Sequence, residues 1–123
     1  MNSKQANRLR EDMKYLTKRD CAMLRMRIEL GWTYKEIGEV LQLSSASARV
    51  RVHKIFKRMV SKEFDMMTQK RKLVPARLRR MGEMLYLEGK SERNIVATTG
   101  YRLHEVRKMK AQLEAVCESI ALR

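Results

Sequence analysis

Apolar residues recur at steps of three and four along most of the chain, while glycine and proline are scarce. This spacing places apolar side chains on one face of an α-helix. The pattern predicts an all-α protein of about six to seven helices. We expect an opening helix over 3–15, then a helix that starts after Thr17 and ends at Gly31. Thr17 with Asp20 forms a capping-box-like start, and glycine accepts the left-handed backbone of a helix stop.

A second capping box, Thr33 with Glu36, predicts a short helix followed by a turn at Ser44. The short helix directs Ile37, Val40 and Leu41 inward, and Gly38 lies where it must approach a neighbour closely. A long basic helix over 45–62 follows, with an apolar stripe of Ala48, Val52, Ile55 and Met59. Phe56, Val60 and Phe64 form a second apolar stripe on the same predicted helix, which suggests packing between two units or against a partner.

The same arrangement recurs 58 positions later without a gap. The matched positions are a helix stop, a helix cap, core anchors, a turn hydrophobe and a basic residue. The pairs are Gly31 and Gly89, Thr33 and Ser91, Ile37 and Ile95, Leu43 and Tyr101, Ala48 and Val106, and Arg49 and Arg107. A leading helix that stops at glycine, a short capped helix and a longer one form a helix-turn-helix unit. The repeat therefore predicts tandem helix-turn-helix units with a long recognition helix in each.

Residues 68–74 are polar and basic, and they separate the two predicted units. Pro75 then suits the first turn of a helix, where its missing N–H leaves no hydrogen bond unmade. We expect a first domain over 1–67 with an N-terminal helix, a linker over 68–74, and a second domain over 75–123 with a long C-terminal helix.

The net charge of +14 indicates an anionic partner, because so large an excess concentrates anions near the surface. DNA, RNA and anionic lipid all meet that condition. Residues 1–80 carry 21 basic and 8 acidic side chains, whereas residues 81–123 carry 7 and 6. If the two units are built alike, the first is the better electrostatic match for phosphates.

No acidic residue lies between Glu39 and Glu63. The N-terminal half of a recognition helix enters the major groove, so we expect phosphate clamping and one or two base contacts here. A solvated helix face is the alternative interpretation. The candidate DNA-binding residues of the first unit are Ser44, Ser45, Ser47, Arg49, Arg51, Lys54, Lys57 and Arg58. Those of the second unit are Arg102, His104, Arg107 and Lys108, where contact with DNA, contact with protein and a purely structural role all stay open.

The segment Leu16–Met59 resembles region four of bacterial sigma factors and the related phage late regulators. The resemblance rests on LTKRD opening a helix, on LGWTYKEIGEVL, on LS at the turn, and on the R-x-R-x-x-K run. It implies promoter-type DNA binding with RNA polymerase as a neighbour. Where that family usually carries charged base-reading side chains, this chain has the small Ser45, Ala46 and Ser47. The second unit, SERNIVATTGYRLHEVRKM, resembles the generic helix-turn-helix of resolvases and repressors.

These features predict a DNA-binding transcriptional regulator of phage or bacterial type that inserts the 45–62 helix into the major groove of double-stranded DNA. The chain lacks the aromatic-rich helical region with which complete sigma factors open DNA, so a self-sufficient sigma factor is not expected. One alternative is an assembly module such as a phage terminase small subunit, forming a homodimer or higher oligomer through the C-terminal helix. Its motivation is a coiled-coil-like stripe of Val106, Met109, Leu113, Val116 and Ile120. The other interpretation of this stripe is that it closes the small core against Leu78, Met81 and Leu85. Another alternative is an adaptor that binds RNA polymerase.

Catalysis is not expected, because no nucleophile–base pair, carboxylate dyad or metal cluster is visible. We therefore expect no enzyme activity, no cofactor and no metal. Cys21 and Cys117 form no CxxC pair, and we interpret both as buried, reduced thiols. No apolar run approaches the roughly 20 residues that cross a bilayer. The sequence thus predicts a cytoplasmic protein of a bacterial cell or a phage-infected host, without membrane contact.

Overall fold

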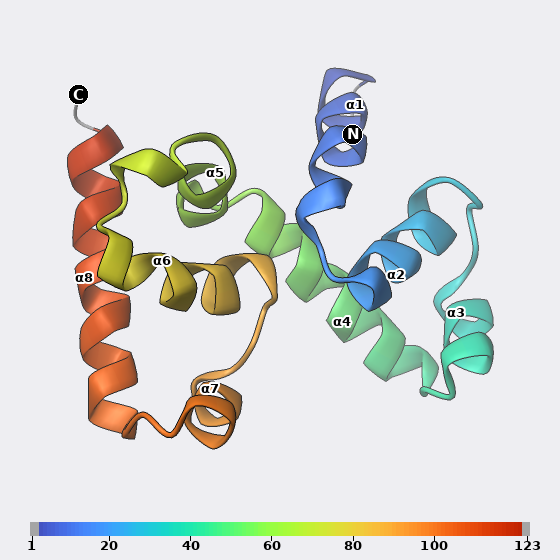
Figure 1. The fold of residues 1–123 in the computed structure, drawn as a ribbon. Coiled ribbons are helices and arrows are strands. Elements are labelled where there is room, and N and C mark those ends of the chain that lie inside the picture. Colours follow the sequence, from blue (N-terminus) through green and yellow to red (C-terminus); the bar gives the residue numbers. More distant parts are fainter. Residues whose placement is uncertain (1–2, 122–123) are drawn as a thin grey trace. The chain divides into compact units, whose positions relative to one another are not determined.

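The computed structural model describes residues 3–121, and this part of the chain contains eight α-helices and no strand (Figure 1). The predicted all-α class is confirmed. The chain divides into two compact units, Met1–Met59 and Val60–Arg123, and each contains a short helix joined by a turn to a longer helix.

The first unit is built from four α-helices and one 3-10 turn. Helix α3 packs against α4, and α2 contacts both of them. The elements are α1 (Ser3–Asp12), the 3-10 turn Met13–Tyr15, α2 (Lys18–Ile28), α3 (Tyr34–Leu41) and α4 (Ser45–Met59). Their buried apolar residues are Leu9, Met13, Met23, Leu24, Ile37, Ala48, Val52, Ile55 and Met59.

Side-chain caps set where these helices begin, as the sequence indicates. The Thr17 hydroxyl accepts the Asp20 N–H at 3.2 Å and starts α2. Before α3, the Thr33 hydroxyl accepts the Glu36 N–H at 3.2 Å, and the Glu36 carboxylate accepts the Thr33 N–H at 3.0 Å. The hydrogen bonds from the Thr33 N–H and from the Thr33 side chain lower the pKa of Glu36. The predicted capping box is therefore complete.

The turn between α3 and α4 passes directly over Gly38. A Cβ at this position would overlap the Leu43 carbonyl oxygen, and the Leu43 N–H donates to the Gly38 carbonyl at 2.8 Å. Gln42 takes the left-handed backbone conformation, with φ of 58°, that turns the chain back. The close approach expected at Gly38 is thus made by the backbone of the turn, and any side chain here would push α4 away from α3.

In the second unit, three helices pack around a long C-terminal helix. Helix α8 packs against α5, α6 and α7. The elements are α5 (Lys62–Gln69), the 3-10 turn Arg71–Leu73, α6 (Ala76–Gly82), the π-helical segment Glu83–Leu87, α7 (Glu92–Thr99) and α8 (Leu103–Ala121). One buried cluster joins them: Met66, Met67, Val74, Leu78, Met81, Met84, Ile95, Val106, Leu113, Cys117 and Ile120.

The 58-residue repeat of the sequence is a repeat of backbone conformation. Gly31 and Gly89 both stop a helix in the left-handed region, with φ of 66° and 68°. Gln42 and Gly100, which occupy matched turn positions, also have left-handed backbone conformations, with φ of 58° and 79°. Three backbone hydrogen bonds of the first unit recur in the second. At the helix stop, Trp32 N–H donates to Met26 O, and Lys90 N–H donates to Met84 O. At the starts of the next two helices, the matching pairs are Ile37 N–H to Thr33 O with Ile95 N–H to Ser91 O, and Ala48 N–H to Ser44 O with Val106 N–H to Arg102 O.

The basic helix is shorter than predicted. It ends at Met59, and a separate helix α5 begins at Lys62, because the Ser61 hydroxyl caps it by accepting the Phe64 N–H at 3.1 Å. The expected 45–62 helix was therefore wrong in its C-terminal turn. The proposed stripe of Phe56, Val60 and Phe64 does not lie on one helix, and Val60 is 75% exposed.

The division between the compact units falls at Met59, earlier in the chain than the sequence indicated. Helix α5 contributes Met66 and Met67 to the core of the second unit. Within the expected linker 68–74, Arg71–Leu73 forms a 3-10 turn and Val74 is fully buried. Divided in this way, the chain carries 14 basic and 6 acidic residues in the first unit and 14 and 8 in the second.

One apolar position differs from the prediction, and the structure decides between the two interpretations of the C-terminal stripe, which lies in the core. Val40, expected to point inward, is 55% exposed. The C-terminal stripe is inside the second unit: Val106, Leu113 and Ile120 are buried in its own core, with Val116 packed against them. The stripe is therefore not an exposed seam for a second copy of the chain.

Candidate nucleic-acid interface

Helix α4 is amphipathic, with one buried stripe and an outward strip directly opposite. The buried stripe is Ala48, Val52, Ile55 and Met59. The residues two positions before each of these lie on the other side, because each residue turns the helix by about 100°. This outward strip consists of Ala46, Val50, His53 and Lys57, and all four are exposed. The packing of α4 on α3 and α2 thus fixes which residues a ligand can reach.

The remaining cations lie on the two flanks of the outward strip. Arg49 lies on one flank, while Arg51 and Lys54 lie on the other with Ser47, and all are exposed. Within residues 3–121, no ion pair or hydrogen bond joins the side chains of Arg49, Arg51, Lys54 or Lys57 to another protein group. Four cations on one helix are therefore available to an anionic partner.

The N-terminus of α4 is organised by hydroxyl groups. The Ser44 hydroxyl accepts the Ser47 N–H at 3.0 Å and donates to the Ser47 hydroxyl at 2.9 Å. Ser45 is exposed in the first turn. Ser44 thus acts as the expected cap, and Ser45 and Ser47 remain at the surface of the first turn of α4.

Arg58 differs from the other candidate residues on α4. Its Nη2 lies 2.7 Å from Oδ2 of Asp20, and the two side chains are only 15% and 20% exposed. The pair ties α4 to α2. Arg58 therefore serves the scaffold, a role that sequence spacing could not show because Asp20 lies 38 positions away.

A cluster that the sequence did not indicate joins α2, α3 and α4. The Arg27 guanidinium carbon lies 4.4 Å from the centroid of the Tyr34 ring, and Arg27 also donates to the Trp32 carbonyl at 2.8 Å. The Tyr34 hydroxyl lies 3.4 Å from Nε2 of His53. Stacking of a cation on an aromatic face is favourable even at exposed sites. The cluster therefore holds His53, on the outward strip, against the body of the unit.

The matching helix of the second unit carries less uncompensated charge. Nε of Arg107 lies 3.1 Å from Oε2 of Glu92, and Nζ of Lys110 lies 3.6 Å from its other oxygen. The hydrogen bond from Arg107 lowers the pKa of Glu92. In the first unit the position of Glu92 is taken by Tyr34, so Arg49 has no such acid beside it. Arg102, directly before α8, is exposed, and so are His104 and Lys108 on α8.

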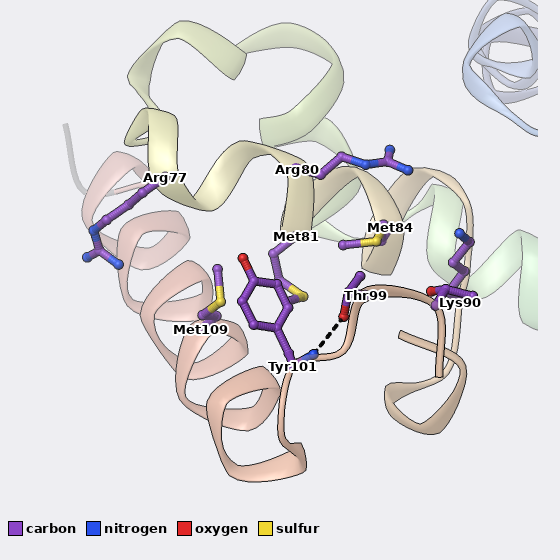
Figure 2. Close-up of a pocket in the computed structure, with 9 residues that line it drawn as sticks. Arg77, Arg80, Met81, Met84, Lys90, Thr99, Tyr101 and Met109 are labelled. Atoms are coloured by element: carbon purple, nitrogen blue, oxygen red, sulfur yellow. Dashed lines mark hydrogen bonds between the residues drawn. The ribbon is translucent and has the colours of Figure 1, made fainter. Parts of the chain in front are cut away.

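A pocket of about 430 Å³ opens in the second unit, beside its turn (Figure 2). The Tyr101 ring lies among Met81, Met109 and Thr99 in this pocket. Tyr101 is the turn residue that matches Leu43 of the first unit. Arg77 at the rim donates to the Gln112 side-chain oxygen at 2.8 Å.

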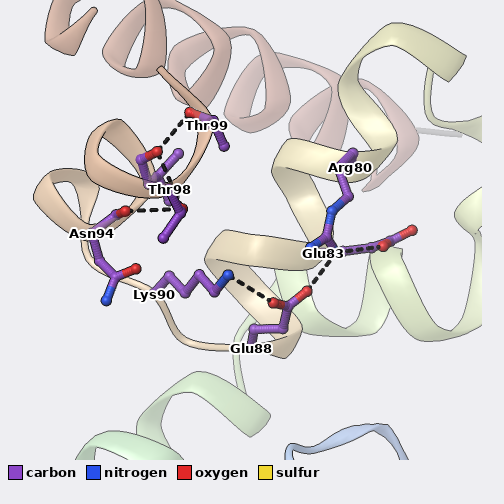
Figure 3. Close-up of polar contacts among 8 residues, drawn as sticks. Arg80, Glu83, Glu88, Lys90, Asn94, Thr98 and Thr99 are labelled. Carbon is purple, nitrogen blue, oxygen red and sulfur yellow. Dashed lines mark hydrogen bonds and ion pairs between the residues drawn. The ribbon is translucent and has the colours of Figure 1, made fainter. Parts of the chain in front are cut away.

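Acidic residues of the same unit neutralise the other two cations of this pocket (Figure 3). Arg80 lies 3.1 Å from Glu83 and 2.6 Å from Glu88, and Lys90 lies 3.3 Å from Glu88. The hydrogen bonds that Arg80 donates to Glu88 and Glu83 raise the pKa of Arg80. Acidic side chains therefore compensate the charges of Arg80 and Lys90 in the pocket. The cations on the flanks of α4 have no such compensation, which suits a surface that binds anions.

Three further findings bear on the predicted chemistry. Cys21 and Cys117 are free; Cys117 is buried, as expected, while Cys21 is half-buried. Among the residues that the structure describes, no group of three or more His, Cys, Asp or Glu side chains could hold a metal ion. None of the helices in residues 3–121 is long and apolar enough to span a membrane.

A known protein family matches the first unit. Residues 7–59 match the family described as sigma-70, region 4. The match runs from α1 to the end of α4 and includes all candidate DNA-binding residues of the first unit. No curated protein and no solved structure matches the chain. Residues 7–59 are therefore similar to sigma-70 region 4, as the sequence resemblance implied.

Proposed function

We propose that the protein is a transcription regulator that binds double-stranded DNA by placing α4 in the major groove. The observation that carries this proposal is the set of four exposed cations on α4 that have no partner among residues 3–121, in a helix-turn-helix similar to sigma-70 region 4. In such units the second helix enters the groove with its N-terminal half against the base edges. Helix α4 presents that half free of acidic residues.

The two flanks of α4 suit the two walls of the groove. Arg49 faces one side of the outward strip, and Arg51 and Lys54 face the other, so their cations can reach phosphates of both strands. Phosphate contacts of this kind position a protein on the duplex and make its affinity depend on salt. Arg58 takes no part in this contact because Asp20 engages it.

The test is the double variant Arg49→Ala plus Arg51→Ala. We expect at least a tenfold loss of duplex affinity in a mobility-shift assay, with the fold intact. A matched control, Lys18→Ala plus Arg19→Ala, removes the same charge from exposed positions of α2. If the control lost as much affinity as the α4 variant, attraction by net charge would explain the binding and the proposal would fail.

RNA polymerase is the protein partner that the family suggests, and the site of action would then be the cytoplasm of a bacterial cell or a phage-infected host. Pull-down of polymerase by the purified chain at moderate salt tests this partner, with the Arg49→Ala plus Arg51→Ala variant separating polymerase contact from contact through DNA. The assembly-module alternative loses its motivation, because the stripe on which it rested lies in the core of the second unit.

A further inference from the structure

The most outward position of α4 carries an apolar side chain. Val50 lies two residues from both Ala48 and Val52, which are fully buried, so it projects directly away from the unit. It is 48% exposed. Ala46 lies one turn earlier on the same strip and is also exposed. The part of the helix that would face the base edges is therefore lined by methyl groups.

Neither helix propensity nor packing explains valine at this position. Valine is a poorer helix former than alanine or a long charged residue, since its branched side chain loses rotamer freedom in a helix. The unit offers Val50 no core to join. Its immediate neighbours Arg49 and Arg51 lie on opposite flanks, so when both reach phosphates, Val50 lies over the floor of the groove. The position therefore points to contact with a base.

Thymine offers the apolar group that suits this surface. In the major groove adenine, guanine and cytosine present amino, carbonyl and ring-nitrogen groups, and thymine adds a C5-methyl group. A valine packed against the polar edge of a base would displace the water bound there. The polar groups of that base would then lose hydrogen bonds that valine cannot replace, which is unfavourable. Against the thymine methyl it buries apolar surface on both sides.

We propose that α4 selects its DNA site through thymine C5-methyl groups, contacted by Val50 and Ala46. This inference rests on the proposed function, since it requires α4 to lie in the groove. One helical turn separates the two residues, about 6 Å along the axis, and base pairs rise about 3.4 Å per step. The preferred site therefore contains two thymines within about two steps of each other, on one strand or on both.

The experiment begins with selection of bound duplexes from a random pool. Each thymine of the selected site is then replaced by deoxyuridine, which removes only the methyl group. We expect one or two replacements to weaken binding by roughly threefold to fivefold, the effect of one buried methyl group, and the others to have no effect. Val50→Ala should bind the thymine and deoxyuridine duplexes equally at one of these positions, because the methyl contact is already lost. Val50→Gln should move the preference there towards adenine, since an amide pairs with the adenine edge.

The outcomes separate this inference from the proposed function. If the wild-type chain selects a site and loses affinity with Arg49→Ala plus Arg51→Ala, but deoxyuridine is tolerated everywhere, then α4 binds DNA and the methyl readout is refuted. Sensitivity to deoxyuridine at one and the same thymine that persists in both Val50→Ala and Ala46→Gly assigns that methyl contact to other residues and also refutes it. A pool that yields no preferred site refutes the readout, whereas absence of duplex binding refutes the proposed function itself. The Val50→Ala variant should keep its fold, because the substitution is at the surface and favours the helix.

Discussion

Replacing Arg58 or its partner Asp20 tests whether the structure divides the cations of α4 correctly. The pair is a charge-assisted hydrogen bond of 2.7 Å between side chains that are 15% and 20% exposed. Such bonds contribute about 1.5–3 kcal/mol, and loss of one partner leaves the other charge poorly solvated. We expect Asp20→Asn and Arg58→Ala each to lower the free energy of unfolding of the first unit by about 2 kcal/mol.

Thermal denaturation followed by circular dichroism measures this loss. For a unit of this size 2 kcal/mol corresponds to a fall in Tm of roughly 10 °C. The matched control is Glu29→Ala, which breaks the exposed pair with Arg25 and should cost less than about 0.5 kcal/mol. If Asp20→Asn melts with the control, the pair does not hold α4 to α2.

DNA binding at a temperature where every variant is folded provides the second half of this test. Lys54→Ala removes a proposed phosphate contact and should reduce the slope of log affinity against log salt by about one, from a wild-type contribution of about −4 for four cations. Arg58→Ala should leave that slope unchanged. The opposite result, a stable Arg58→Ala variant with a smaller salt slope, would refute the scaffold role that the structure assigns to Arg58.

Three other substitutions or labelling experiments test separate parts of the account. Gly38→Ala should destabilise the first unit by roughly 2–4 kcal/mol in urea denaturation, since its Cβ would overlap the turn backbone; a loss near 0.5 kcal/mol would show that the turn yields easily. The pKa of Glu92, measured by NMR titration, should lie below 4.5 and return towards that value in Arg107→Ala, because the hydrogen bond from Arg107 is the main cause of the shift. The ion pair between Glu92 and Arg107 is therefore present above pH 4.5 and is lost as the pH falls through the lowered pKa of Glu92. An identical titration of Glu92 in the wild-type chain and in Arg107→Ala would contradict the contact between the two side chains. Iodoacetamide at pH 8 should modify Cys117 more slowly than Cys21, because burial raises the pKa of the Cys117 thiol and limits access to it; mass spectrometry showing equal rates would place Cys117 at the surface.

Local sequence signals were sufficient to predict most of the fold. The caps at Thr17, Thr33 and Ser91 and the glycine stops at Gly31 and Gly89 each depend on residues a few positions apart. Such short-range interactions can be read directly from the chain. The repeat strengthened each prediction, because the same local rules had to hold twice.

The end of α4 was missed although a local signal was present. Ser61 is a good helix cap, and Glu63 and Asp65 lie in the first turn of α5, where acidic residues favour a helix start. The continuing apolar spacing through Phe56 and Phe64 concealed this signal. Helix periodicity does not show a two-residue interruption when the apolar pattern resumes in register.

The candidate site could be predicted only in part, because charge balance is a tertiary property. Sequence spacing indicated the cationic character of α4, but not that Asp20 engages Arg58 or that Glu92 engages Arg107. Both acids lie on other helices. The outward strip was equally hidden, since the choice between Val50 and Arg51 as the outermost residue depends on which stripe of α4 the unit buries.

The most direct measurement of the central claim is an NMR spectrum of the chain bound to its selected duplex, with the methyl groups of Ala46 and Val50 labelled. Helix α4 in the major groove predicts intermolecular NOEs from these methyl groups to major-groove protons, such as thymine methyl, cytosine H5 or purine H8. NOEs from another surface of the chain to the duplex, with none from Ala46 or Val50, would contradict the account.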